Sequence, residues 1–219
     1  MNAIMAKNAI QAKNTIQDTL DGWEASWASY DEATYRDVLA QICDKDIVFE
    51  IGAGDLRLAI RMAGIARIVH AVEIQKPLLE QIIYSSVALP ANLFIHCRDA
   101  RSMPVPPGTT VGVLLMRHCT HFQLYAQKLK EAGAQALVTN ARWKLGVERV
   151  PLQEKRLLID DIEMGWYACW CGAVGFKPGP AEKLTPELLA ARYELATCPQ
   201  CSSALRSGTM SPGNQLLGL

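Results

Sequence analysis

The chain has 219 residues and a mass of 24.1 kDa, which fits one α/β domain with a small appendage. Half of its residues are hydrophobic, and 22 Lys and Arg balance 22 Asp and Glu, so no long-range attraction to nucleic acid is indicated and long DNA is not an expected partner. No apolar run is long enough to cross a membrane, the start does not look like a secretory signal, and seven cysteines then indicate a reducing, cytoplasmic setting.

Residues 1–45 are predicted to form an N-terminal helical segment. Trp23, Trp27 and Tyr30 recur at i, i+4 and i+7, which is typical of a helix face packed on a core. Aromatic residues at this spacing can instead cover a cofactor or substrate pocket. Both interpretations remain open at this point.

The most informative stretch is residues 47–55, where an apolar run with β-branched residues ends in Glu50 and a Gly-x-Gly turn, Gly52 and Gly54. A second apolar run ends in another acid, Glu73, which lies 21 residues after Gly52. A strand that runs into a glycine turn lets the backbone approach a ligand closely, and an acid at the tip of the next strand is placed to bind a ribose diol. The pattern therefore predicts an adenosine-containing cofactor.

The residues around the turn discriminate between cofactors. A dinucleotide-binding turn needs a third glycine for helix packing and for room beside the pyrophosphate, and Arg57 stands at that position. No Gly-Lys-Ser/Thr follows, which excludes a Walker phosphate-binding loop. Glu50 is unfavourable beside an anion, but it suits a ligand whose nearby end carries an ammonium or sulfonium group.

The chain between residues 46 and 160 alternates predicted strands with predicted helices. This alternation predicts an α/β fold with a doubly wound, mostly parallel, Rossmann-like sheet and helices on both faces. Ligands of such sheets bind beyond the carboxyl ends of the strands. Four charged residues fall at those ends: Glu50, Glu73, Asp99 and Arg117.

Over roughly residues 30–145, the chain resembles the class I S-adenosylmethionine-dependent methyltransferases. The first motif of that family reads acid-x-Gly-x-Gly, and Glu50, Gly52 and Gly54 match it. The resemblance implies that Glu73 binds the ribose hydroxyls and that Asp99 meets the adenine amino group. The cofactor-binding residues that it implies are Glu50, Gly52, Ala53, Gly54, Glu73, Ile74, Asp99 and Ala100.

The chain departs from the family pattern in two places. Leu56 replaces a frequent third glycine, and no Asn/Asp-Pro-Pro-Tyr motif follows Met116, so base methylation of the usual DNA type is not expected. The alternative to the resemblance is that the three acids are ordinary solvated charges at strand ends of another α/β fold.

The segment Arg117-His118-Cys119-Thr120-His121 follows the fourth predicted strand, at the family's catalytic edge. Methyl transfer to a weakly acidic acceptor needs a general base, and histidine titrates near neutrality. The hypothesis is that His118 or His121 is the base and that Arg117 orients an anionic acceptor. Alternatively, His121 caps the next helix, and the polar atoms of His118 find their hydrogen-bond partners within the loop. A metal site on the two histidines would lack an obvious third ligand.

Residues 161–219 are predicted to form a zinc-ribbon-like C-terminal extension. Cys169 and Cys171 form a Cys-x-Cys-Gly pair, and Cys198 and Cys201 form a Cys-x-x-Cys pair. Four thiolates make a closed tetrahedral site, which suits structural zinc and leaves no position open for catalysis. A redox pair at Cys198 and Cys201 is disfavoured because it lacks a thioredoxin-type context. The extension either holds the neighbouring strands together or recognises a protein or nucleic acid. For the second role, residues 142–156 carry five basic and two acidic residues, a local excess of positive charge.

Three functions follow as hypotheses. The first is an S-adenosylmethionine-dependent methyltransferase whose acceptor is a small molecule, a protein or RNA, with no membrane partner. The second is an NAD-dependent oxidoreductase, which Arg57 disfavours. The third is a non-catalytic binding module that engages a partner through the zinc ribbon.

Overall fold

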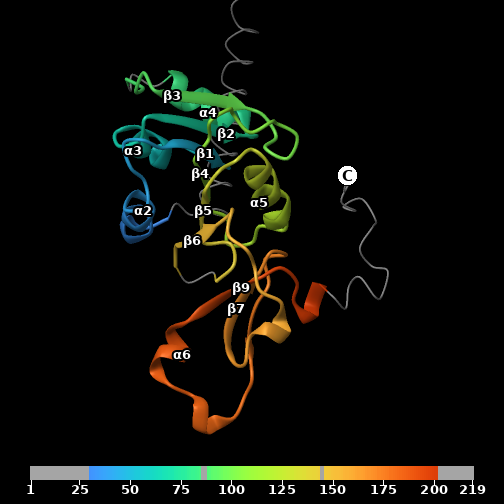
Figure 1. Cartoon of the computed structure of the whole chain (residues 1–219). Helices are drawn as coiled ribbons and strands as arrows, with labels where there is room; N and C mark the ends of the chain where they lie inside the picture. The colour runs from blue at the N-terminus through green and yellow to red at the C-terminus, as the bar shows by residue number, and fades with distance from the viewer. Residues whose placement is uncertain (1–29, 85–87, 144–145, 202–219) are drawn as a thin grey trace, which may run out of the picture.

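The computed structural model of the chain describes residues 30–84, 88–143 and 146–201. Figure 1 shows a larger body around a six-stranded sheet and a smaller body, around a three-stranded sheet, that contains most of the C-terminal part of the described chain. The expectations on Trp23 and Trp27 lie outside the described residues. Among the helices that are described, none combines the length and apolar character needed to span a bilayer.

The large sheet confirms the predicted fold class. Its order is β3-β2-β1-β4-β5-β6; the first five strands are parallel and β6 is antiparallel to β5. The strand order reverses between β1 and β4, which is where ligands bind in sheets of this kind. The strands are β1 (Ile47–Ile51), β2 (Ile68–Glu73), β3 (Leu93–Cys97), β4 (Val111–Leu114), β5 (Ala136–Thr139) and β6 (Glu148–Pro151).

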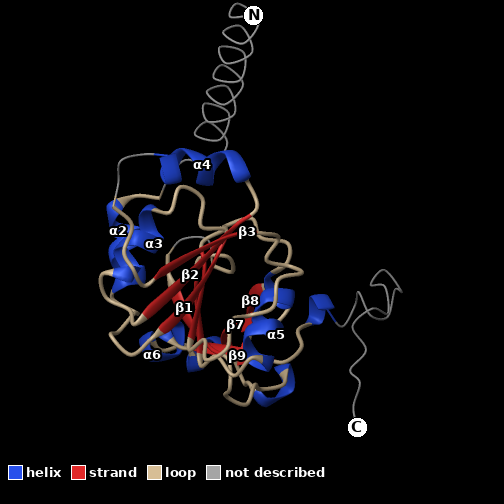
Figure 2. Cartoon of the chain, turned by 90° about the horizontal axis from the view of Figure 1, so that it is seen from above, coloured by secondary structure: helices blue, strands red, loops and turns tan. Residues whose placement is uncertain are grey.

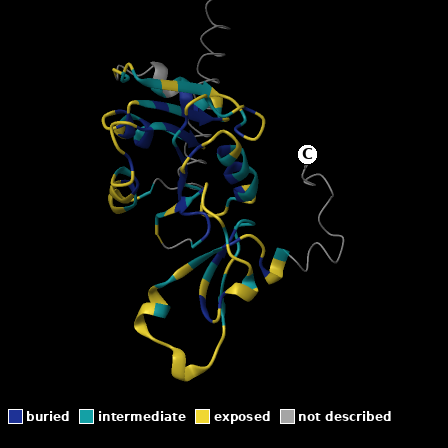
Figure 3. Cartoon of the chain, viewed as in Figure 1, coloured by how far each residue is buried: buried dark blue, intermediate teal, exposed yellow. Residues whose placement is uncertain are grey.

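Helices cover both faces of this sheet. Apolar residues of α2, α3 and α4 pack in one core cluster against one face, and those of α5 pack in a second cluster on the other face (Figure 2). The buried residues of the two clusters form the interior of the larger body in Figure 3. The bounds of the four helices are α2 (Glu32–Leu39), α3 (Arg57–Ala63), α4 (Lys76–Tyr84) and α5 (Phe122–Glu131).

The connection from β3 to β4 contains no helix. It is held to α5 by Lys128, whose Nζ donates to the backbone carbonyls of Ala100, Arg101 and Met103 at 2.6–2.9 Å. These three bonds fix the loop that begins with Asp99 over the carboxyl end of the sheet. The loop is therefore a fixed wall of the region where the strand order reverses.

The smaller body is a three-stranded sheet with β7 in the centre, antiparallel to β8 and parallel to β9. The exposed residues of this body concentrate around α6 and the segment before it (Figure 3). The predicted boundary at residues 160 and 161 falls in the connection between the two sheets. The elements after β6 are two 3₁₀ segments (Ile159–Asp161 and Ala181–Lys183), β7 (Gly165–Cys169), β8 (Val174–Lys177), α6 (Pro186–Ala190) and β9 (Arg192–Leu195).

Arg142 joins the two bodies. Its fully buried guanidinium donates to Glu148 on β6 and to Glu194 on β9, at 2.6–2.8 Å. These two carboxylates hold the Arg142 pKa above its usual value although burial opposes the charge. A buried charge is tolerated only when it is paired and hydrogen-bonded, so this contact locks β9 against the end of the large sheet.

Candidate functional site

The glycine turn after β1 has the backbone that the sequence pattern requires. Gly52 and Gly54 have φ angles of 73° and 56°, in the left-handed region that favours glycine. A Cβ added to Gly52 would make ordinary contact with the Met116 side chain, at 3.4 Å, so glycine is favoured here by the backbone angle and not by space. Leu56 is left-handed as well and fully buried, and it stands where the resembled family often has a glycine. Its burial in the core offsets the backbone strain of this conformation.

Glu73 is fixed at the tip of β2. Its Oε2 accepts a hydrogen bond from the Gly54 amide and its Oε1 accepts one from the Gln75 amide, both at 2.8 Å. The residue is only 5% exposed. Each carboxylate oxygen has a further lone pair, so Glu73 can still accept from two hydroxyls of a ligand.

Glu50 is a buried carboxyl group without a compensating partner. It is 5% exposed, and its Oε2 has no hydrogen-bond partner among the residues that the structure describes. Burial raises the Glu50 pKa to about 8, and the nearby carboxylates of Asp55 and Glu73 raise it further in the same direction. Because buried polar groups are nearly always satisfied, this oxygen points to a ligand that carries a donor or a cation.

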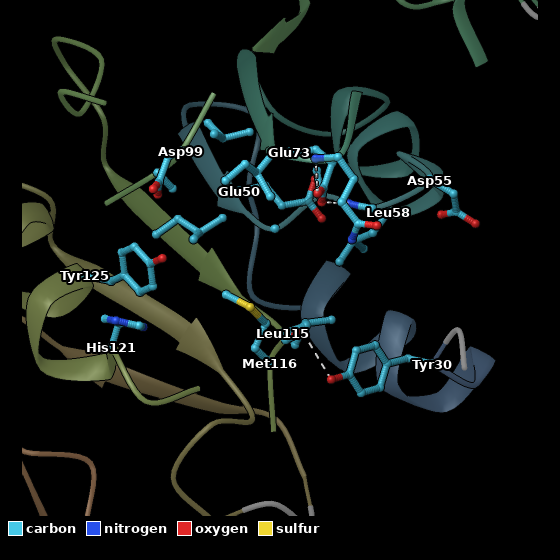
Figure 4. Close-up of a pocket in the computed structure, with 18 of the residues that line it drawn as sticks. Tyr30, Glu50, Asp55, Leu58, Glu73, Asp99, Leu115, Met116, His121 and Tyr125 are labelled. Carbon is cyan, nitrogen blue, oxygen red and sulfur yellow. Dashed lines mark hydrogen bonds between the residues drawn. The ribbon is translucent and has the colours of Figure 1, made fainter. Parts of the chain in front are cut away.

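Asp99 starts the loop after β3, and Arg101 binds it through both carboxylate oxygens at 2.6–3.0 Å. These bonds, with that from the Arg101 amide, lower the Asp99 pKa to about 2. Asp99 is therefore an ionised acceptor throughout the neutral range. Figure 4 shows it across the pocket from Glu50 and Glu73.

One cavity of about 550 Å³ collects the predicted residues at the carboxyl ends of β1, β2 and β4. Tyr30 closes its edge, since its hydroxyl donates to the Leu115 carbonyl at 3.1 Å and its ring lies 5.2 Å from the Arg117 guanidinium carbon. The predicted residues that line this cavity are Glu50, Gly52, Ala53, Gly54, Glu73, Ile74, Asp99, Ala100, Arg117, His118 and His121.

The structure also places residues in this cavity that the sequence did not indicate. Tyr125 on α5 lines it beside His121, with ring centroids 6.3 Å apart (Figure 4). Met116 lies between the glycine turn and α5, and Gln75 lies next to Glu73. The four-residue spacing from His121 was the available signal for Tyr125, since it places both side chains on one face of a helix.

The two histidines after β4 are not engaged as helix caps. His121 precedes α5, but its side chain makes no capping hydrogen bond; its Nδ1 lies 3.2 Å from Thr120 Oγ1. His118 is exposed, and within the described segments no hydrogen bond to its ring is found. Both ring nitrogens of His118 and Nε2 of His121 therefore remain available to a ligand in the cavity.

The four predicted cysteines converge in the smaller body. Sγ atoms of the pairs Cys169–Cys201, Cys171–Cys198 and Cys198–Cys201 are 3.7–3.8 Å apart, and all four lie within 4.8 Å of one another. Thiolates at about 2.3 Å from a tetrahedral zinc ion are separated by roughly 3.8 Å, so the cluster has the size of such a site. The distances are far longer than a disulfide bond, and the cysteines are free.

The basic residues between 142 and 156 do not form a surface track where they are described. Arg142 is buried between two glutamates, and the Arg156 guanidinium stacks 3.6 Å from the Trp170 ring. Arg149 donates to the Gln41 carbonyl at 2.9 Å. Arg142 and Arg156 are thus engaged internally, which leaves Arg149 and Lys155 as the exposed basic residues of this segment where it is described. Two exposed charges give no support to nucleic-acid recognition by the extension.

No protein-family profile matches the sequence, and no curated protein matches it. Part of the chain is similar to many solved structures of methyltransferases. They include a dimethyladenosine transferase from Plasmodium falciparum (20% identity, TM-score 0.40, 50% of this chain and 40% of that one). The 23S rRNA methyltransferase ErmE is similar at 20% identity and a TM-score of 0.43, over 50% of this chain and 46% of that one.

Phosphoethanolamine N-methyltransferase 1 from Haemonchus contortus is a third similar structure, with 14% identity and a TM-score of 0.43. The match covers 57% of this chain and 31% of that one. The matched part thus spans less than half the length of these three proteins. Because these identities and TM-scores are low, the function has to be argued from the residues of this chain.

Proposed function

We propose that the chain is an S-adenosylmethionine-dependent methyltransferase. The observation that carries the proposal is the convergence of Glu50, Glu73 and Asp99 on one cavity beside the glycine turn. Solvated charges at the strand ends of an unrelated fold would not be expected to include a buried carboxyl group that lacks a partner. Such a group is costly unless a ligand uses it.

Each carboxylate suits a different part of the cofactor. Glu73, fixed by two backbone amides, accepts from the ribose hydroxyls. Asp99 and the neighbouring Ala100 are placed to meet adenine, and Glu50 to pair with the ammonium group of the methionine end. Gly52 and Gly54 let the chain approach the ligand closely, together with Ala53 and Ile74.

The cofactor supplies a methyl group on a positively charged sulfur, which a nucleophile takes by in-line displacement. For this reaction the chain has to hold the acceptor close and to remove its proton. His118 and His121 are the candidate bases, and Arg117 is the candidate for orienting an acceptor with a negative charge. The acceptor is proposed to be a small molecule, a protein or RNA.

The cysteine cluster is proposed to hold one zinc ion through Cys169, Cys171, Cys198 and Cys201. Four thiolates close the coordination shell, so the ion would stabilise the small body and take no part in proton transfer. The chain also carries free, exposed thiols at Cys43 and Cys97. This combination suits the reducing conditions of the cytoplasm.

An NAD-dependent oxidoreductase is the second candidate enzyme, and the site argues against it. Arg57 begins α3 where a dinucleotide site needs its third glycine, and Glu50 would face a pyrophosphate with a carboxyl group. A non-catalytic binding module would bind no cofactor, so it would have no need for three carboxyl groups in this cavity.

A thermal-shift comparison separates these three functions. The zinc-loaded protein is heated alone and with S-adenosylhomocysteine, S-adenosylmethionine or NAD, because a ligand that binds the native state raises the melting temperature. The proposal predicts a rise with the first two ligands and none with NAD. A rise with NAD alone would favour the oxidoreductase, and no rise with any ligand would favour the binding module.

A further inference from the structure

A second cavity, of about 510 Å³, adjoins the first. The two cavities share two lining residues, Arg117 and His118, so they meet at the segment that follows β4. The second cavity is otherwise walled by Cys119, Thr120 and Phe122 on one side and by residues 171–173 and 200–201 of the small body on the other. A molecule in this cavity would therefore touch both the proposed base and the two turns that carry Cys171 and Cys201.

Arg117 dominates the charge of this cavity. Apart from Cys171 and Cys201, whose thiolates would be bound to the metal, Arg117 is the one permanently charged side chain among the described lining residues, and no carboxylate is found among them. The Arg117 guanidinium lies over the ring of Tyr30, and the structure gives it no ion pair within 4 Å in the part of the chain that is described. The first cavity differs in having carboxyl groups, those of Glu50, Asp55, Glu73 and Asp99, in addition to its arginines.

The size and charge of the second cavity limit what it can take. Its volume is that of an ordinary small-molecule pocket, with small residues such as Gly172 and Ala173 in its wall. A guanidinium matches the planar geometry of a carboxylate with two parallel hydrogen bonds. One guanidinium balances one carboxylate, whereas it would leave a doubly charged phosphate half unpaired.

We propose that the second cavity is the acceptor site and that its ligand is a small carboxylic acid, bound by Arg117 with its nucleophilic atom at His118. The role as acceptor rests on the proposed methyltransferase function, but carboxylate binding by this cavity does not. In the transfer, the acceptor's nucleophilic atom bonds to the methyl carbon while the carbon–sulfur bond breaks. S-adenosylhomocysteine leaves, and the acceptor's proton passes to His118 and then to water.

This arrangement gives the small body a role in recognition. Cys171 and Cys201 belong to the cluster and also line the acceptor cavity. A metal that holds these two cysteines in place would hold one wall of the cavity in place. The cluster then shapes the acceptor site without contributing to the chemistry.

Cys119 provides a direct probe of this cavity, because its thiol lines the second cavity and not the first. Iodoacetate is a small carboxylate that alkylates thiolates, and iodoacetamide is its neutral analogue. Both reagents react with the same Cys119 thiolate, so the fraction of thiolate cancels in the ratio of their two alkylation rates. The ratio therefore reports how strongly the cavity prefers the anionic reagent to the neutral one. The rates are measured on the zinc-loaded protein with Cys43→Ser and Cys97→Ser, and the Cys119 adduct is quantified by peptide mass spectrometry.

The comparison uses Arg117→Gln and a matched variant, Arg67→Gln, which removes an exposed positive charge before β2 and outside both cavities. We expect Arg117→Gln to lower the iodoacetate-to-iodoacetamide ratio about fivefold and Arg67→Gln to leave it unchanged, because a charge acts mainly within a Debye length. An equal ratio in the parent and in Arg117→Gln would overturn the carboxylate proposal.

Cofactor binding is measured on the same samples, so that the two proposals can fail separately. S-adenosylhomocysteine affinity should change less than about twofold when Cys119 is carboxymethylated, because the adduct fills only the second cavity. A ratio that depends on Arg117 in a protein that does not bind S-adenosylhomocysteine would keep the anion site and refute the methyltransferase. A loss of S-adenosylhomocysteine binding on carboxymethylation would refute the separation of the two sites.

Discussion

Glu73 Oε2 accepts a hydrogen bond of 2.8 Å from the Gly54 amide, which joins the tip of β2 to the glycine turn after β1. The acid that is proposed to bind ribose therefore also fixes the turn that is proposed to approach the cofactor. Since both groups are held before any ligand arrives, binding does not have to order them. This hydrogen bond makes the proposed cofactor site a preorganised unit.

Removing the Glu73 carboxylate should damage both functions of that bond. We expect Glu73→Ala to weaken S-adenosylhomocysteine binding by about 10- to 100-fold, because hydrogen bonds to a charged group contribute roughly 1.5–3 kcal/mol. The melting temperature should fall as well, since the Gly54 and Gln75 amides lose their acceptor. Glu80→Gln on α4 lies outside the cavity and is the control. Calorimetric titration that finds equal affinity in Glu73→Ala and the control would remove the ribose role.

The raised pKa of Glu50 predicts that cofactor affinity depends on pH. Below its pKa of about 8 the free protein holds Glu50 protonated, and pairing with the ligand's ammonium group requires the ionised form. Affinity for S-adenosylhomocysteine should therefore increase by up to about tenfold per pH unit and level off near pH 8. Calorimetry in buffers of different ionisation enthalpy should detect the released proton. A flat affinity profile in the wild type, matching that of Glu50→Gln, would contradict the assignment.

The same carboxyl group should make the free protein less stable as the pH rises. Its folded-state pKa, about 8, lies above the unfolded value of 4.5, so the folded state binds the extra proton between these limits. As the pH rises across that window, the contribution of Glu50 to the free energy of unfolding falls by about 1.4 kcal/mol per pH unit. Below the window, this contribution does not change with pH. Glu50→Gln should remove this slope from denaturant titrations. A slope that survives the substitution would have to come from other groups.

Removing the metal should unfold the small body while sparing the large one. The core of the small body contains few fully buried residues, including Cys169, Leu195 and Cys198, so the body depends on its metal. We expect one zinc per chain, loss of that zinc in Cys198→Ser, and a clear fall in melting temperature. S-adenosylhomocysteine affinity should persist, because no cluster cysteine lines the first cavity. Cys97→Ser, which removes an exposed thiol, should change neither metal content nor stability.

Arg142 should be one of the most destabilising positions to change. Arg142→Met leaves Glu148 and Glu194 next to each other without their shared cation, which should cost about 3–5 kcal/mol of unfolding free energy. Arg149→Met, on the exposed side of β6, is the matched control and should cost much less. Chemical denaturation measures both. Adding Glu148→Gln and Glu194→Gln to Arg142→Met should recover part of the loss, and a further loss instead would contradict this account.

The two histidines should differ in their effect on turnover. His118 lines both cavities, whereas His121 lines only the cofactor cavity, so we expect His118→Ala to slow methyl transfer by about 100-fold or more. His121→Ala should have a smaller effect. S-adenosylhomocysteine affinity and melting temperature serve as controls for folding. Full activity in both variants would remove the base assignment.

The fold and the convergence of Glu50, Glu73 and Asp99 on one cavity could be predicted because their signals are local. The run from Ile47 to Ile51 is apolar apart from Glu50. Acids at the ends of neighbouring strands meet at one edge because parallel strands end on the same side. The Gly-x-Gly turn at Gly52 and Gly54 is also a local signal, and both glycines adopt the left-handed backbone that favours this residue. Such features can be read without knowing which distant segments pack together.

Other features depend on distant contacts and left no local signal. β6 has four residues with one fully buried, Val150, and contains a proline, so only its pairing with β5 makes it a strand. Arg142 looks like part of a basic surface, but Glu194, 52 residues away, makes it a buried connection. The second cavity forms where the segment after β4 meets the turns that carry Cys171 and Cys201, and no spacing in the sequence indicates that contact.

Isothermal titration of the zinc-loaded protein with S-adenosylhomocysteine would show whether the first cavity binds the proposed cofactor. We expect one site per chain with micromolar affinity, proton release below about pH 8, and binding about 10- to 100-fold weaker in Glu73→Ala. The absence of binding in a folded, zinc-loaded sample, or binding of NAD in its place, would contradict the proposal.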